Sequence, residues 1–330
     1  ISEEAARVAR ELAAAGAREV TLIGGEAYLR ADVYDLVALL TELGVWVTMQ
    51  TGGRALTATR ARRFREAGLK GLGVSVDGPE AIHDELRGNT GSWAAAMRAL
   101  EHGAAEDLPV TVNTQVNRLS APVLRETMGP LRDRRVRTWR CQLTAPMGAA
   151  ADHPEWILEP WRIVEVIDTL AELQVEAARS PRPWELPAPH RMFSVRLGNN
   201  LGYYGPHEEL LRSNPGGRSS IYGGCPAGRS VLSVESDGTM KACPSLPTAP
   251  YAGANVRDRA VAEAWAEDPA LGFTRDPGPD ELWGFCATCA YAELCRGGCN
   301  FTAHATLGRR GNNPFCYHRA ALLRRQGRRE

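Results

Sequence analysis

The chain has 330 residues, and its 39 basic and 39 acidic residues give a formal net charge of zero. A neutral balance of this kind gives no sign of a nucleic-acid partner or of an anionic membrane surface. No run of about 18 or more apolar residues occurs, so we expect no transmembrane helix. Hydrophobic residues make up 44% of the chain, which is enough at this length for a large domain and a smaller one.

The N-terminal part of the chain alternates helical patterns with short apolar runs. The predicted helices are 5–15, 33–43, 59–67, 93–102 and 122–132, and the predicted strands are 19–23, 45–49, 71–76, 110–116 and 136–143. Glycine follows four of these helices, as expected at helix ends: Gly16, Gly44, Gly68 and Gly103. Short helix–strand connections predict parallel βα units. No Gly-x-Gly-x-x-Gly turn is present, so a barrel is favoured over a nucleotide-binding sheet.

The rest of the chain is less regular, and we divide the sequence into three segments. Residues 1–150 form the predicted barrel. Residues 151–220 form a connecting region with a helix at 161–179, a proline-rich stretch at 181–189 and a Gly/Asn/Tyr loop at 198–206. Residues 221–330 combine short strands, turns and cysteines, and end in an arginine-rich helix at 319–329.

Seven of the eight cysteines lie between positions 225 and 316. Without a secretory signal, such local spacing favours metal binding over disulfides, and therefore a reducing compartment, the cytoplasm. The pattern is Cys286-x2-Cys289-x5-Cys295-x3-Cys299, with Cys225, Cys243 and Cys316 outside it. Thiolates suit iron–sulfur clusters or zinc, but these spacings are poor for a zinc knuckle.

Cys243 follows a predicted hairpin, 231–234 and 239–242, that turns at Asp237-Gly238. Seven thiols are too many for one cluster and nearly enough for two cubanes with four thiolates each. Two clusters are the favoured interpretation. A zinc site and structural free thiols remain the alternatives.

The cysteine spacing, with Gly238 five positions before Cys243, resembles the SPASM domain of radical SAM enzymes. Gly24-Gly25-Glu26 after a strand resembles the motif that holds the amino group of S-adenosylmethionine (SAM) in these enzymes. The run 74–78 (Val-Ser-Val-Asp-Gly), followed by His83-Asp84 and Arg87-Gly88, is similar to the family's fourth strand and the loop after it. The resemblance implies an α/β fold: a partial (β/α)6 TIM-like barrel followed by a small α+β iron–sulfur domain.

The resemblance also implies site residues. Cys225, Cys243 and Cys299 would bind a first auxiliary [4Fe-4S] cluster, and Cys286, Cys289, Cys295 and Cys316 a second. The fourth position of the first cluster is open; Cys141 is a candidate, although we expect it to be a buried small side chain. The SAM-binding candidates are Gly24, Gly25, Glu26, Thr51, Ser75, Asp77, Arg87 and Gln142. A plain turn is the alternative for the glycines and Thr51, a structural polar network for Ser75 and Asp77, and a surface salt bridge for Arg87.

One departure from the family concerns the cluster that cleaves SAM. Its Cys-x3-Cys-x2-Cys motif precedes the first helix in the family, and this sequence has no cysteine before Cys141. We expect that motif, with the first strand, upstream of Ile1 in a longer protein. Residues 1–330 alone are then not expected to cleave SAM.

The activity implied is formation of a 5′-deoxyadenosyl radical that modifies a ribosomally synthesised peptide by cross-linking, thioether formation, epimerisation or oxidation. The auxiliary clusters would aid electron transfer or substrate binding. The implied partners are a leader-binding protein and an external flavodoxin- or ferredoxin-type electron donor, without nucleic acid or membrane. The alternatives are a radical SAM enzyme acting on a small metabolite, such as a sugar or aminocyclitol, and a non-catalytic iron–sulfur protein that carries electrons or binds a partner. No catalytic residue is identified.

Overall fold

The computed structural model describes residues 1–179, 193–214, 218–275 and 281–329. The chain divides into two compact units: unit 1 comprises residues 1–142 and 169–196, and unit 2 comprises residues 143–168 and 197–330. These units do not follow the three predicted segments, because residues 169–196 return to unit 1. The proline-rich stretch predicted at 181–189 lies outside the described residues.

Unit 1 is built on a six-stranded sheet with the strands in sequence order. The strands are β1 (Glu19–Leu22), β2 (Trp46–Thr51), β3 (Gly71–Ser75), β4 (Val110–Val116), β5 (Thr138–Leu143) and β6 (Ser194–Leu197). β1 to β4 pair in parallel, with Leu22 opposite Met49 and Ser75 opposite Asn113. A parallel sheet in sequential order, with helices between the strands, confirms the predicted α/β partial barrel. β6 was not predicted.

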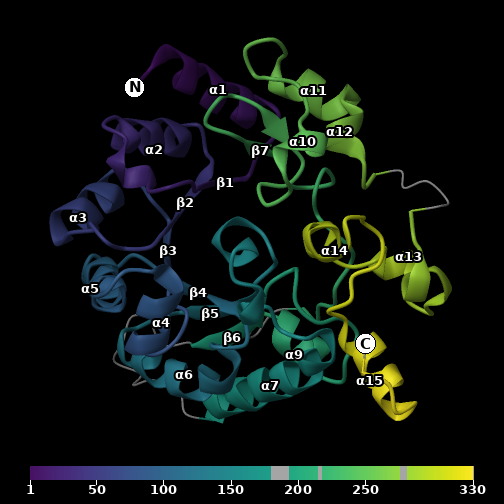
Figure 1. Cartoon of the computed structure of the whole chain (residues 1–330). Helices are drawn as coiled ribbons and strands as arrows, with labels where there is room; N and C mark the ends of the chain where they lie inside the picture. Colours follow the sequence, from purple (N-terminus) through teal and green to yellow (C-terminus); the bar gives the residue numbers. More distant parts are fainter. Residues whose placement is uncertain (180–192, 215–217, 276–280, 330) are drawn as a thin grey trace. The chain divides into compact units, whose positions relative to one another are not determined.

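Helices connect the strands of unit 1 and pack on the outer face of the sheet (Figure 1). They are α1 (Glu3–Ala14), α2 (Val33–Glu42), α3 (Ala58–Glu66), α4 (Glu80–Arg87), α5 (Ser92–Ala105), α6 (Leu124–Asp133) and α7 (Ile163–Arg179). α4 was not predicted. The prediction that Gly103 ends a helix is wrong, because Gly103 lies inside α5. A Cβ at Gly103 would meet Leu72 and Val110 at 2.8 Å, so glycine is needed there for close helix–sheet packing.

The two faces of the sheet differ in character. Along β4, Val110, Val112 and Val116 are buried, whereas Asn113 and Gln115 are only half-buried. Side chains alternate between the faces of a strand, so the apolar set lies beneath the helices and the polar set on the inner face. Each buried valine contributes about 1.5–3 kcal/mol, so this alternation fixes the register of the sheet.

Unit 2 consists of short elements joined by loops. Its hairpin, β7 (Ser233–Val234) and β8 (Met240–Lys241), is antiparallel and confirms the predicted turn at Asp237-Gly238. Its helices include α9 (Glu208–Arg212), α10 (Thr248–Tyr251), α11 (Val261–Glu267), α12 (Pro269–Gly272), α13 (Ala292–Cys295), α14 (Asn300–Leu307) and α15 (Tyr317–Arg325). The predicted C-terminal helix therefore begins two residues earlier than expected, directly after Cys316.

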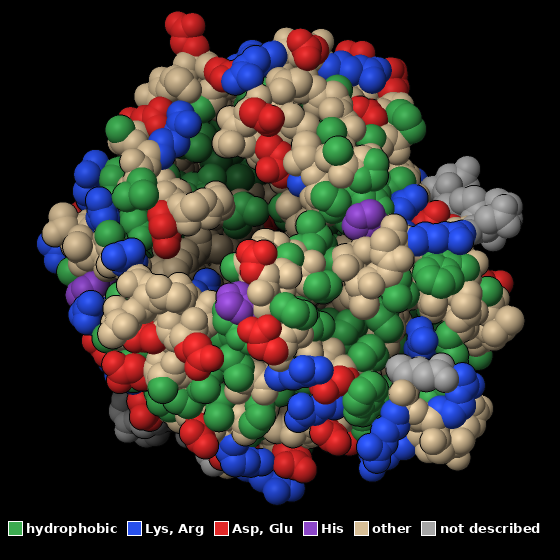
Figure 2. Space-filling model, viewed as in Figure 1, with side chains coloured by type: hydrophobic (Ala, Val, Ile, Leu, Met, Phe, Trp, Pro, Cys, Tyr) green, Lys and Arg blue, Asp and Glu red, His purple; other side chains and the backbone are tan. Residues whose placement is uncertain are grey.

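Acidic and basic side chains are interspersed over the face of the molecule shown in Figure 2, in keeping with the net charge of zero. Within the described residues, no helix is both long and apolar enough to cross a membrane.

Candidate functional site

A row of amide side chains crosses the inner face of the sheet in unit 1. Asn113 on β4 donates to Gln50 on β2 over 2.6 Å, and Gln142 on β5 donates to Asn113 over 3.3 Å. Gln50 reaches across β3 because Gly73 has no side chain; a Cβ there would lie 2.0 Å from Gln50 Oε1. A barrel without a ligand inside is filled by bulky apolar side chains. The amide row therefore marks this face as a surface for a polar ligand.

Glu26 lies at the end of this face, where its carboxylate is held by the loop after β2. The Thr51 hydroxyl donates to Glu26 Oε2, and the Gly52 amide donates to Glu26 Oε1 over 2.9 Å. Thr51 is buried, but Glu26 remains half-exposed. Two donors thus orient a carboxylate that can still meet a cation from solvent.

Gly24 and Gly25 precede this carboxylate in an exposed loop. Gly24 has a φ of +116°, and a Cβ at either glycine would have no neighbour within 4 Å. Gly24 thus has a backbone conformation that other residues rarely adopt, and both glycines have free space where a side chain would lie. The two glycines leave room for a ligand to approach the main chain beside Glu26.

Asp77 and Arg87 bind each other in this structure. Asp77 is 2% exposed. Its carboxylate accepts from Arg87 Nε over 2.7 Å and from the backbone N–H of Gln115 over 2.8 Å. β3 ends at Ser75, so Asp77 lies in the loop after the strand and not on the strand beside Ser75. Asp77 anchors the loop after β3 to β4, and Arg87 neutralises it. Their predicted contacts with SAM stay predictions.

His83 completes this loop and makes a pH dependence testable. Burial lowers the pKa of His83 from 6.5, and its Nδ1 accepts from the Asp77 amide over 3.0 Å, which requires the neutral ring. The unfolded chain therefore binds a proton more readily than the folded one, so stability falls as pH drops below about 6.5. We expect urea midpoints to fall between pH 7 and pH 5 more steeply for the unchanged chain than for His83→Gln. Parallel slopes would contradict this assignment.

Three of the seven clustered cysteines in unit 2, Cys225, Cys243 and Cys299, lie close enough together to influence thiol pKa values within the group. Burial raises the pKa of the Cys299 thiol to about 12, and the neighbouring Cys225 and Cys243 add to the rise. Burial also raises the pKa of Cys225, and Cys243 contributes again. Backbone amides soften both shifts: Thr302 donates to Cys299, and Asn300 and Ala227 donate to Cys225. Thiols gathered in this way, with amide donors to sulfur, suit thiolate ligation.

The other four cysteines form a second group. Burial raises the pKa of Cys295 to about 12 and of Cys286 to about 11, and the thiol of Cys289 contributes to both shifts. The pKa of Cys316 is raised by burial and by the other three thiols of this group. Cys299 and Cys316 occupy the N-caps of α14 and α15, where helix dipoles favour a thiolate.

Within the described parts of the chain, no three His, Cys, Asp or Glu side chains converge tightly enough to hold a single metal ion. A cubane cluster spreads its four thiolate ligands over four different irons. The seven thiols therefore need not converge on one point to bind such a cluster, and Cys299 of the first group also packs in one buried cluster with Cys295 of the second.

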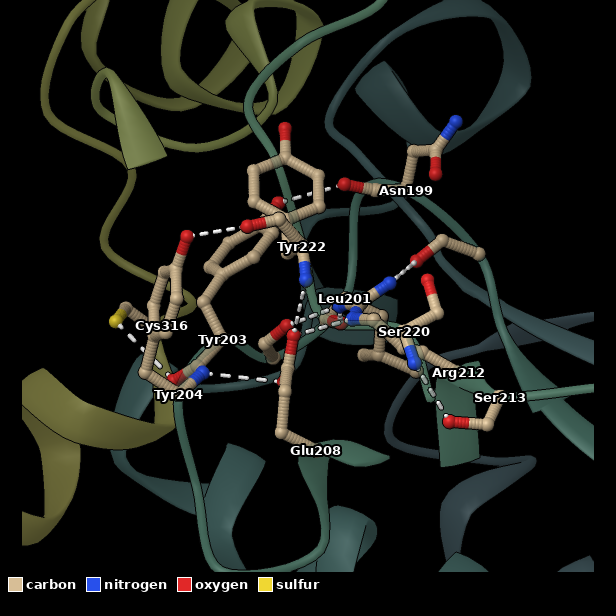
Figure 3. Close-up of polar contacts among 12 residues, drawn as sticks. Asn199, Leu201, Tyr203, Tyr204, Glu208, Arg212, Ser213, Ser220, Tyr222 and Cys316 are labelled. Atoms are coloured by element: carbon tan, nitrogen blue, oxygen red, sulfur yellow. Dashed lines mark hydrogen bonds and ion pairs between the residues drawn. The ribbon is translucent and has the colours of Figure 1, made fainter. Parts of the chain in front are cut away.

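Tyr203 contacts both thiol groups through different atoms, and Figure 3 shows its contacts with Asn199 and Cys316. Its hydroxyl accepts from the Cys299 amide over 3.1 Å and from Asn313 Nδ2 over 3.2 Å, and donates to the Asn199 carbonyl over 2.9 Å. Its carbonyl accepts from Cys316 Sγ over 3.8 Å. Tyr203 is 1% exposed. One buried residue thus contacts the Cys299 backbone amide and the Cys316 thiol.

A buried ion pair between Glu208 and Arg212 stabilises the loop that carries Tyr203. Arg212 Nε donates to Glu208 Oε1 over 2.6 Å, and the other Glu208 oxygen accepts from the Tyr204 amide. The Tyr222 amide also donates to Glu208, over 2.9 Å. Breaking a buried pair of this kind is strongly destabilising, so Glu208 and Arg212 stabilise the tyrosine loop.

Tyr203→Phe is expected to lower the free energy of unfolding by about 2–3 kcal/mol, because it leaves buried donors at Cys299 and Asn313 without their acceptor. Urea unfolding of the anaerobically purified chain measures this. Tyr317→Phe is the matched control; its hydroxyl donates to Asp168 near the surface, and its loss should cost less than about 1 kcal/mol. Equal losses in the two variants would contradict the role given to Tyr203.

Several residues of these sites were not predicted. Tyr203, Asn313, Glu208 and Arg212 were passed over, although the Asn199-Asn200 and Asn312-Asn313 pairs are a signal, because buried asparagines usually tie loops together. Asn200 bonds both backbone groups of Leu143. Cys141 is fully buried on β5, which confirms the prediction of a buried small side chain.

The chain is similar in sequence to several known proteins. Residues 1–116 match the model of the Radical SAM superfamily. The chain is 27% identical over 320 residues to an AdoMet-dependent heme synthase of Methanosarcina barkeri, covering 96% of this chain and 87% of that protein. It is 27% identical over 324 residues to a PqqA peptide cyclase of Rhodopseudomonas palustris, covering 93% and 75%.

A solved structure, native anSMEcpe with bound AdoMet and the Kp18Cys peptide, shares the fold with a TM-score of 0.71 at 17% identity. The alignment covers 98% of this chain and 86% of that one. β1 to β4, with Glu26, Gln50 and Asn113, lie in the part matched by the family model, whereas β5 with Gln142 and β6 lie outside it. Residues 1–116 therefore match a radical SAM domain, and this match, together with relatives that are named as enzymes, indicates that the chain is an enzyme.

Proposed function

We propose that this enzyme uses SAM to modify a ribosomally synthesised peptide by radical chemistry, and that its seven clustered cysteines hold two auxiliary [4Fe-4S] clusters in a SPASM-type domain. The observation that carries the proposal is the division of the thiols into one group of three and one of four. A complete set of four suits a fully ligated cluster. A set of three leaves one iron free for another ligand.

The inner face of unit 1 is the proposed SAM site. The Glu26 carboxylate, oriented by Thr51 and Gly52, would bind the amino group of SAM, and Gly24-Gly25 would let the ligand approach the backbone. Ser75 and Gln142, both half-buried on this face, would bond other polar atoms of SAM. When bound, SAM and a reduced [4Fe-4S] cluster supply the 5′-deoxyadenosyl radical. This chain's residues orient the reactants and exclude water.

Clusters bound by the two thiol groups would serve electron transfer or substrate binding in unit 2. The group of four would form a closed cluster suited to passing electrons. The group of three would accept an electron from the substrate or bind a substrate thiolate at its open iron. Tyr203 would help to position both sets, because its hydroxyl accepts from the Cys299 backbone amide and its carbonyl accepts from the backbone amide of His318, two residues after Cys316. An external flavodoxin- or ferredoxin-type donor would reduce the clusters.

A peptide is the preferred substrate for two reasons. A relative that matches 93% of this chain is named a PqqA peptide cyclase, and the similar solved fold was determined with a peptide bound. A separate leader-binding protein would then deliver the peptide. The relatives named AdoMet-dependent heme synthase favour a second candidate, a tetrapyrrole that carries carboxylate side chains.

The test is anaerobic incubation of the full gene product with SAM and dithionite, with mass spectrometry of the products. The peptide from a neighbouring short reading frame and Fe-coproporphyrin III are supplied in separate reactions. We expect 5′-deoxyadenosine in both and a mass change in the peptide alone. A mass change in the tetrapyrrole alone would establish the second candidate. No 5′-deoxyadenosine under any condition would contradict radical chemistry.

A further inference from the structure

Arg196 on β6 is a buried cation. The residue is 7% exposed, and within the described residues neither Nη1 nor Nη2 has a hydrogen-bond partner although both are buried. Burying a charge without a partner is strongly unfavourable. The guanidinium is therefore positioned for a group that the described residues do not supply.

A second arginine lies beside it on the same face of the sheet. The Thr138 and Ser194 hydroxyls approach to 3.4 Å across β5 and β6, so residues two positions further along each strand share that face. These residues are Arg140, which is exposed, and Arg196. Burial and the positive charge of Arg140 both lower the pKa of Arg196. Two like charges next to each other call for an anion between them.

We propose that Arg140 and Arg196 bind a carboxylate of the substrate, an inference that rests on the function proposed above. A planar guanidinium fork matches a carboxylate with two parallel hydrogen bonds. Arg196 supplies a fixed, desolvated donor, and Arg140 supplies a solvent-facing one. The neutral amides of Asn113 and Gln50 lie further across the same face of the sheet, where they can contact the uncharged part of the substrate.

The carboxylate of SAM itself does not fit this place. The amino and carboxylate groups of SAM share one carbon, and Glu26, the proposed amino site, is held at the end of β2. β6 is four strands away in the sheet, about 19 Å along it at about 4.8 Å per strand. The anion at Arg196 therefore comes from the second reactant.

The first experiment uses succinate as a probe and compares Arg196→Met, Arg140→Met and the control Arg10→Met, which alters an exposed arginine on α1. At constant ionic strength, replacing chloride by succinate should raise the Tm of the unchanged chain and of Arg10→Met by about 2 °C. The rise should disappear in Arg196→Met and shrink in Arg140→Met. Equal shifts in all four proteins, or none in the unchanged chain, would overturn the proposal.

The second experiment identifies the source of the carboxylate and separates this proposal from the proposed function. Binding of the co-encoded peptide, of its form with Asp and Glu amidated, of Fe-coproporphyrin III and of its methyl ester is measured on each variant. The true substrate should bind Arg196→Met about tenfold or more weakly, and its neutralised form should not distinguish the variants. SAM affinity should not change. If SAM cleavage persists while no carboxylate depends on Arg196, only this inference fails.

Discussion

Glu26→Gln is expected to weaken SAM binding by about tenfold to a hundredfold, because the amide keeps its acceptor for the Gly52 N–H but loses the negative charge proposed for the SAM amino group. Equilibrium binding of SAM to the anaerobic enzyme measures the change. The fold should survive, since the side chain keeps its size and one of its two hydrogen bonds.

Glu19→Gln is the matched control, because Glu19 is an exposed carboxylate on β1 whose partner is Thr48. It removes the same charge from the same strand–loop unit and should leave SAM affinity unchanged. If both variants weakened SAM binding equally, the effect would come from the overall electrostatic potential of the domain. Glu26 would then have no specific role in SAM binding.

Cys316→Ala and Cys243→Ala are expected to remove different clusters. Cys316 belongs to the group of four thiols and Cys243 to the group of three. Each variant should lose about four irons and four sulfides and keep the rest, because the groups use separate ligands. Iron and sulfide analysis after anaerobic reconstitution measures this, with circular dichroism to confirm folding.

Cys141→Ala is the matched control, because Cys141 is buried on β5 and belongs to neither thiol group. It should keep the full iron content. The division of the thiols into two sets would be incorrect if both variants kept all their iron. It would also be incorrect if the clusters that remain in Cys316→Ala and in Cys243→Ala had the same visible absorption spectrum.

The sequence predicted the sheet well where each strand carries its own signal. β4 was predicted with its observed bounds because buried and half-buried residues alternate along all of it. β6 was missed because all four of its side chains are buried, so it shows no alternation, and one of them is Arg196. α4 was missed because it follows Pro79 within a loop that was interpreted through its motif.

The site could be predicted only where ligands are close in sequence or share a motif. Cys286 to Cys299 and Gly24-Gly25-Glu26 are local patterns. Tyr203 acts through Cys299 and Asn313, which lie 96 and 110 positions away, so no periodicity could connect them. The pairing of Arg87 with Asp77 likewise depends on the path of α4, which the sequence did not predict.

The most direct test of the account is the iron, sulfide and zinc content of the anaerobically reconstituted chain. The seven thiols in sets of three and four predict about eight irons and eight sulfides in residues 1–330, without zinc. A single zinc without sulfide would contradict the account, and unit 2 would then be a structural metal domain.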